Sequence, residues 1–178
     1  GVEKALSECP SVRHVIAHGD RIPGTLSFGD LLPGQPEQAV SEDTSRGDFA
    51  RIMYSSGTTG QPKGILTTVE GILSVSDTQA RHILKVRPDD TLGGHPYFSF
   101  AFGAAGFLFI PWRFGAGVSV VSRFSPERMF QLIDEHGITI LFCVPTAFRM
   151  MLGIGDAEQR YQLSTLRLGQ SAGEPLPE

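Results

Sequence analysis

The chain has 178 residues, of which 40% are hydrophobic and 19% charged, and its formal net charge is −4. This length allows one domain with a sizeable core, and the composition is typical of a folded globular protein, which argues against general disorder. The negative charge and the lack of a Lys/Arg cluster argue against a broad nucleic-acid-binding face. The two cysteines, Cys9 and Cys143, have neither metal-ligand nor disulfide-framework spacing. They suit a reducing cytosol, so we expect a cytoplasmic protein.

The first residues are polar and include neither a secretory signal nor an initiator methionine, so we expect a segment of a longer chain. A short helix is predicted over 3–9 and a strand over 12–17. From 19 to 47 the chain is polar and rich in Pro and Gly, with one helix-like segment over 26–32. Helix, proline and strand in this order are a first indication of an α/β fold.

The most informative stretch is the loop Tyr54–Gly64, which lies between a predicted strand over 49–54 and an extended segment over 64–68. Its glycines leave backbone N–H groups open to an anion, its hydroxyls add donors, and Lys63 supplies a mobile positive charge. We interpret the loop as a cradle for a polyphosphate. The residues expected to hold the phosphates are Ser55, Ser56, Gly57, Thr58, Thr59, Gly60 and Lys63.

A surface turn and a Walker P-loop are the two alternative interpretations of this loop. A simple surface turn rarely needs three glycines, four hydroxyls and a Pro-Lys-Gly sequence so close together. A Walker P-loop requires Gly before the lysine and Ser or Thr after it, whereas Pro62 and Gly64 flank Lys63 here. No helix is expected directly after the lysine either, because the segment 65–68 is β-branched and apolar.

The segment after the loop predicts a helix over 69–84, a turn over 85–90 and a strand over 91–94. The uncharged stretch 93–112 is the one candidate for a membrane span. Its prolines, glycines and polar side chains are not those of a spanning helix, so we expect buried core instead.

Four aromatic residues lie within 97–102, and two interpretations of them stay open on sequence alone. Aromatic side chains bury large areas, which favours hydrophobic core. The glycine-rich continuation over 103–106 lets another surface come close, which suits the wall of a ligand pocket as well as packing.

The C-terminal part alternates predicted strands and helices. This order is typical of βαβ units, so we expect an α/β fold with an open, largely parallel sheet flanked by helices. Ser125 is expected to cap one helix and Gly137 to end it, and Phe148, Met151 and Leu152 are expected in the core. The expected segments are a buried strand over 117–122, a helix over 126–136, a central strand over 138–144, a helix over 145–152, a loop over 153–162, a strand over 163–170 and a turn over 171–178 that opens a helix.

The loop Tyr54–Gly64 resembles the phosphate-binding loop of the adenylate-forming superfamily. This superfamily comprises AMP-forming acyl- and aryl-CoA synthetases, luciferases and peptide-synthetase adenylation domains. The resemblance implies a loop that holds the β- and γ-phosphates of ATP while a carboxylate attacks the α-phosphate. It also implies that Tyr97, Phe100 and Gly103 line an acyl pocket, and that Ala172, Gly173, Glu174 and Pro175 lie beside the adenine and the acyl group.

Three details qualify the resemblance. Phe100 would favour an apolar or aromatic acid, because an apolar pocket removes an apolar group from water. Val69 stands where many members of the superfamily have His, and a Val-Pro-Thr turn at 144–146 matches the superfamily in a structural sense. For the turn over 171–175, an ordinary connection from a strand to a helix is the simpler interpretation on sequence alone.

The superfamily continues beyond this point with a Tyr-Gly-x-Thr-Glu segment, an Asp for the ribose, a hinge and a C-terminal lid that carries a catalytic Lys. We therefore expect residues 1–178 to be a single partial domain, an interior segment of a larger N-terminal domain that is inactive on its own. The full-length parent would be an acid–thiol ligase that uses ATP, Mg²⁺, CoA and a small carboxylic acid. A peptide-synthetase-type adenylation domain and a non-catalytic nucleotide-binding module are the alternatives, and the acid itself stays open.

Overall fold

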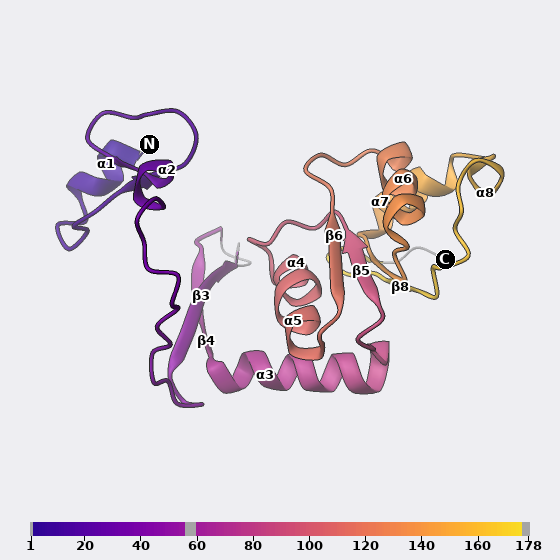
Figure 1. Ribbon diagram of the computed structural model, residues 1–178, viewed down its shortest axis with the longest axis horizontal. Coiled ribbons are helices and arrows are strands. Elements are labelled where there is room, and N and C mark those ends of the chain that lie inside the picture. Colours follow the sequence, from indigo (N-terminus) through magenta and orange to yellow (C-terminus); the bar gives the residue numbers. More distant parts are fainter. Residues whose placement is uncertain (1, 56–59, 176–178) are drawn as a thin grey trace. The chain divides into compact units, whose positions relative to one another are not determined.

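A computed structural model describes residues 2–55 and 60–175 of the chain (Figure 1). The chain divides into two compact units, Gly1–Asp43 and Thr44–Glu178. Within the described ranges, no helix is both long enough and apolar enough to cross a membrane. That the chain belongs to one larger domain stays a prediction.

The first unit contains short elements only. Strands β1 and β2 pair in parallel over two residues each. The strand predicted over 12–17 is therefore shorter than expected, since only its last two residues find a partner strand. Within the helix-like segment predicted over 26–32, only Phe28–Leu31 is helical, and the side chain of the preceding Ser27 makes no capping hydrogen bond. The elements are α1 (Val2–Ser7), β1 (Ile16–Ala17), β2 (Leu26–Ser27) and α2 (Phe28–Leu31).

The second unit begins with an antiparallel hairpin. Strands β3 (Phe49–Ser55) and β4 (Lys63–Thr68) pair along their length, so the predicted loop is held between two strands. A helix follows β4 directly. Thr68 caps it, because its Oγ1 accepts a hydrogen bond from the N–H of Gly71 at 3.1 Å.

The helix predicted over 69–84 is confirmed. It consists of α3 (Val69–Thr78) and a π-helical continuation, η1 (Gln79–Leu84). It ends at Lys85, whose backbone is left-handed with φ 49°. The turn predicted over 85–90 then leads into the sheet.

Four parallel strands in the order β6-β5-β7-β8 form the sheet of this unit, which confirms the predicted α/β fold. The registers place Leu92 of β5 beside Ile140 of β7, and Ile140 beside Leu168 of β8. The strands are β5 (Thr91–Gly94), β6 (Gly117–Val120), β7 (Ile140–Phe142) and β8 (Leu168–Gln170).

Two hydrophobic clusters lie on the two faces of the sheet, and β7 contributes to both. Leu141 packs with α6 (Pro126–His136) and α7 (Pro145–Leu152). Ile140 and Phe142 pack with Leu92 and with the helices on the other face. Because successive side chains of a strand point to opposite faces, the apolar run in β7 is buried on both, as predicted for a central parallel strand.

The caps of α6 confirm the prediction made for this helix. The Oγ of Ser125 accepts a hydrogen bond from the N–H of Arg128 at 3.1 Å. Gly137 ends the helix in a left-handed conformation with φ 59°. The capping serine and the terminating glycine are both signals local in sequence, and the structure confirms both.

A helical segment over 101–114 was not predicted. It consists of α4 (Ala101–Ala104), the π-helical η2 (Ala105–Phe109) and α5 (Ile110–Phe114). Gly106 faces the ring of Phe142, and a Cβ at position 106 would lie 2.8 Å from its Cδ1. The glycine thus allows the helix to pack closely on the sheet, and the expectation of buried core holds for Phe107 and Ile110.

Other expectations for the C-terminal part were wrong. Strand β6 is an edge strand among the described elements, so Val118 and Val120 are each 38% exposed where a buried strand was expected. Leu152, expected in the core, is 84% exposed at the last turn of α7. The segment predicted as loop contains a short helix, α8 (Ala157–Arg160), and the last strand is only three residues long.

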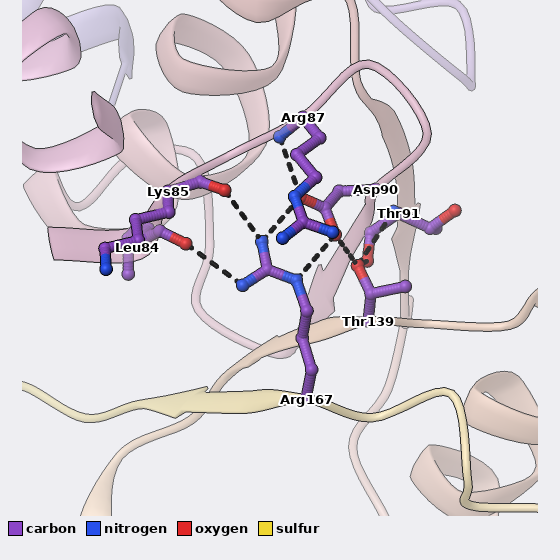
Figure 2. A network of polar contacts seen from close by, with 7 residues as sticks. All are labelled: Leu84, Lys85, Arg87, Asp90, Thr91, Thr139 and Arg167. Atoms are coloured by element: carbon purple, nitrogen blue, oxygen red, sulfur yellow. Dashed lines mark hydrogen bonds and ion pairs between the residues drawn. The ribbon is translucent and has the colours of Figure 1, made fainter. Parts of the chain in front are cut away.

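A polar network joins the amino ends of the strands (Figure 2). Asp90, which is 4% exposed, accepts hydrogen bonds from Arg167, from the Oγ1 of Thr139 and from the N–H of Arg87. The guanidinium of Arg167 also donates to two carbonyl oxygens at the end of η1, those of Leu84 and Lys85. The network therefore ties three strands and one helix together.

Candidate functional site

The phosphate-loop residues lie at the end of the β3–β4 hairpin. Ser55 is paired with Lys63 in the last position of the ladder, and Tyr54 with Gly64. Ser56, Gly57, Thr58 and Thr59 lie outside the described residues. Gly60 has φ 77°, a left-handed conformation that side chains disfavour.

The side chain of Lys63 is exposed to solvent. Its partner in the ladder, Ser55, contributes a hydroxyl beside the same opening of the loop. A flexible ammonium group and a hydroxyl at the start of a Gly-rich loop are able to bind a phosphate from two sides. The described part of the loop thus keeps the predicted arrangement of strand, loop, lysine and strand.

The second group of predicted residues lies at the carboxyl edge of the sheet. Strands β5, β7 and β8 end at Gly94, Phe142 and Gln170, which are register partners or neighbours of one another. The segments that follow them therefore emerge at one edge. In open α/β sheets, ligands bind outside the carboxyl ends of the strands.

Glu174 joins two of these segments. Its carboxylate accepts hydrogen bonds from the N–H of Thr146 at 3.1 Å and from the Oγ1 of Thr146 at 2.6 Å. These bonds hold the pKa of Glu174 below its ordinary value. The structure thus brings the predicted 171–175 segment onto the Val-Pro-Thr turn that begins α7, a contact that the sequence alone did not indicate.

Ser171 lies at the same edge and is half-buried. Its Oγ is enclosed and makes no hydrogen bond with the described residues. A buried hydroxyl without a partner is uncommon in folded proteins.

The aromatic segment 97–103 is not simply core. Phe102 packs against Phe142 with ring centroids 5.3 Å apart, but Tyr97 and Phe100 are 64% and 61% exposed. A Cβ at Gly103 would collide with the backbone of Tyr97, so the glycine allows the chain to fold back on itself there. The structure thus brings the predicted pocket residues Tyr97 and Gly103 into contact, with Phe100 presented to solvent between them.

His95 is a residue of this edge that sequence reasoning missed. It follows β5 directly, and its Nε2 accepts a hydrogen bond from the N–H of Val144 at 3.4 Å. The signal that was available is the Gly93-Gly94 pair before it, because two glycines at the end of a buried strand indicate a close approach of another backbone.

The model of the AMP-binding enzyme family matches residues 2–178. The chain belongs to this family. The superfamily resemblance seen in the loop is thereby confirmed. The family match covers both compact units of the chain.

Relatives of this AMP-binding enzyme chain include named CoA ligases. It is 34% identical over 177 residues to a 4-hydroxybenzoate–CoA/benzoate–CoA ligase of Rhodopseudomonas palustris, across 99% of this chain and 33% of that protein. It is 32% identical to an acetyl-coenzyme A synthetase of Bacillus subtilis, across 96% of this chain and 31% of that protein. The chain therefore spans about a third of the length of these relatives.

The fold of this AMP-binding enzyme chain also matches that of a solved ligase. An anthranilate–CoA ligase in complex with anthranoyl-AMP superposes with a TM-score of 0.86 and 30% sequence identity. The match covers 99% of this chain and 34% of that one. Proteins named as acid–CoA ligases are thus similar to this chain both in sequence and in fold.

Proposed function

We propose that this chain is a segment of an AMP-forming acid–CoA ligase. The full-length protein would convert a carboxylate and ATP into an acyl-adenylate and pyrophosphate, and then transfer the acyl group to CoA. Support comes from the relatives, which are named as ligases for 4-hydroxybenzoate or benzoate and as acetyl-coenzyme A synthetases.

The observation that carries this proposal is the arrangement of the β3–β4 hairpin. Ser55 and Lys63 are paired where the Gly-rich loop leaves the two strands. In the proposed reaction, Ser55, Thr58, Thr59 and the amides of Gly57 and Gly60 hold the β- and γ-phosphates of ATP. Lys63 neutralises charge on the departing pyrophosphate, a role suited to a flexible point charge.

In this proposal, the adenine and the acyl group are bound at the carboxyl edge of the sheet. Ala172, Gly173 and Pro175 lie beside the adenine and the acyl group, while Glu174 holds their segment on the turn at Thr146. The proposed reaction also requires Mg²⁺ and CoA. Because this chain spans about a third of the length of these relatives, we propose that it is inactive alone. The full-length protein is proposed to be cytoplasmic.

The acid is proposed to be aromatic or apolar. Phe100 offers an exposed phenyl ring beside the close contact of Tyr97 and Gly103, and an apolar wall favours an apolar group. Relatives named for 4-hydroxybenzoate or benzoate and for anthranilate agree with this choice, whereas those named as acetyl-coenzyme A synthetases do not. Assaying the full-length protein with benzoate and with acetate separates the two, because an aromatic preference requires the higher kcat/KM with benzoate.

The central test is the variant Lys63→Ala in the full-length protein. Acid-dependent pyrophosphate release should fall by about 100-fold, as is typical when one charge-stabilising donor is lost. Lys63→Arg should restore part of the rate, since it keeps the charge. Lys4→Ala is the matched control, because Lys4 is exposed and lies in the first unit.

Two outcomes would contradict the proposal. An unchanged rate in Lys63→Ala would favour a nucleotide-binding module without chemistry. Formation of the acyl-adenylate without any thioester on addition of CoA would favour a carrier-protein acceptor, as in a peptide-synthetase adenylation domain.

A further inference from the structure

His95 is the first residue after β5, at the carboxyl edge of the sheet. The preceding residue, Gly94, lies so close to β7 that a Cβ there would collide with the carbonyl oxygen of Phe142. The backbone N–H of His95 donates a hydrogen bond to the same oxygen at 3.4 Å. Glycine at position 94 therefore brings the side chain of His95 against the turn that follows β7.

The imidazole of His95 is held between an aromatic ring and a backbone amide. Its centroid lies 4.8 Å from that of Phe124, and its Nε2 accepts the hydrogen bond from the N–H of Val144. Nε2 accepts a hydrogen bond only in the neutral ring that carries its proton on Nδ1. The contact therefore depends on the protonation state of His95.

The turn Val144–Thr146 is held from two sides. His95 binds its first residue from the end of β5, and Glu174 binds its last residue from the segment after β8. Both side chains act as acceptors for backbone N–H groups of the turn. The position of this turn, and of the 171–175 segment attached to it, is thus linked to His95.

Burial favours the neutral ring of His95. It lowers the pKa of His95, whereas a hydrogen bond with the backbone of His95 and the carboxylate of Glu174 act in the opposite sense. Cys143, which lies next to the backbone N–H of His95, is itself neutral because burial raises the pKa of its thiol to about 12. Phe124 is apolar, and Arg149 of α7 acts on Glu174 by lowering its pKa.

We propose that His95 is a positioning residue, whose neutral imidazole fixes the Val144–Thr146 turn and, through Thr146 and Glu174, the 171–175 segment. This inference rests on the proposed function, in which that segment lies beside the acyl-adenylate. Protonation turns Nε2 into a donor that faces the donor N–H of Val144. The turn is then released, and the acid is bound less well.

The test compares His95→Gln and His95→Phe in the full-length protein, by kcat and KM for the acid between pH 5 and 8.5. Phe keeps a ring but has no acceptor, so KM at pH 8 should rise about tenfold with a smaller change in kcat, as expected for one lost hydrogen bond. Gln offers an acceptor at every pH, so KM should stay within about threefold of the wild type. The wild-type loss of kcat/KM in acid, with a midpoint below 6.5, should be absent in His95→Gln.

His82→Gln is the matched control, because His82 is an exposed histidine on η1. It should leave both KM and the pH profile unchanged. A wild-type KM in His95→Phe would overturn the proposal. So would an acid-side loss in His95→Gln equal to that of the wild type.

A second measurement does not depend on activity. In the full-length protein labelled with ¹⁵N-valine, the amide of Val144, assigned with Val144→Ile, should shift with a midpoint below pH 6.5 in the wild type. It should not titrate in His95→Gln. A Val144 amide that does not titrate in the wild type overturns the role of His95 even in an active enzyme. The Val144 amide could also titrate in a protein that releases no pyrophosphate with any acid tested. That result would refute the proposed function but support the contact of His95 with the turn.

Discussion

The guanidinium of Arg167 lies against the buried carboxylate of Asp90, with Nη2 2.6 Å from Oδ2 and Nε 2.9 Å from Oδ1. The two residues are 77 positions apart in the sequence. Two parallel N–H···O bonds of this kind are stronger and more directional than a single ion pair. The pair therefore joins the start of β5 to the start of β8.

Replacing Arg167 with Met should lower the free energy of unfolding by about 3–5 kcal/mol, because it leaves a buried carboxylate without its charged partner. The carbonyl oxygens of Leu84 and Lys85 lose a donor as well. Urea unfolding of the full-length protein, followed by fluorescence, measures the change. The control is Arg128→Met, whose exposed pair with Glu135 should contribute at most about 1 kcal/mol. Equal losses in the two variants would refute the argument.

The stability of the protein should fall in acid because of Asp90. Burial alone would raise the pKa of Asp90, but hydrogen bonds from Arg167, Thr139 and Arg87 outweigh it and lower the pKa from 3.8 to about 2. The folded state thus binds this proton more weakly than the unfolded chain does. The stabilisation is present above about pH 4 and is lost as the pH falls to about 2, with a total of about 2 kcal/mol.

Free energies of unfolding measured between pH 2 and 5 test this expectation. The comparison is Asp90→Asn, which is less stable throughout but lacks the titrating carboxyl group. Its stability should fall by about 2 kcal/mol less than that of the wild type over this range. The same slope in both proteins would show that Asp90 is not the group responsible.

Gly106→Ala should destabilise the protein by about 1–3 kcal/mol, as is typical of overpacking in a tight core. The added Cβ would lie 2.8 Å and 2.9 Å from the Cδ1 and Cε1 of Phe142, so the ring or the helix has to move. Thermal and urea unfolding measure the loss. Gly155→Ala is the control, since a Cβ there meets nothing within 4 Å. A gain in stability for Gly106→Ala, as expected from helix propensity alone, would contradict the packing argument.

The features that the sequence predicted well are encoded by neighbouring residues. Helix α6 begins at a Ser-Pro pair and ends at Gly137, and both signals act within one turn of the helix. The apolar run of β7 predicted a central strand because such a run is buried on both faces. The loop after β3 was likewise predicted between two strands from consecutive residues, and strands β3 and β4 flank it.

The features that the sequence did not predict depend on distant residues. The helical segment over 101–114 follows Phe100, which makes no capping hydrogen bond, and its glycines gave no helix signal. One of these glycines is explained by a residue distant in sequence, because Gly106 accommodates the ring of Phe142. In the candidate site, the contact of His95 with Val144 spans 49 residues and that of Thr146 with Glu174 spans 28. Only the folded chain reveals such pairs.

The polar network at the amino edge has a consequence for how the strands are aligned. Asp90, Thr139 and Arg167 each stand one residue before a strand, ahead of β5, β7 and β8 respectively. A run such as Ile140-Leu141-Phe142, buried on both faces, would be almost as well buried after a shift along its neighbours. A shift of a single residue in any of the three strands would separate the charged and hydroxyl groups. The apolar residues alone therefore do not specify the alignment of these strands. The contacts among these three side chains do, because they form in one alignment only.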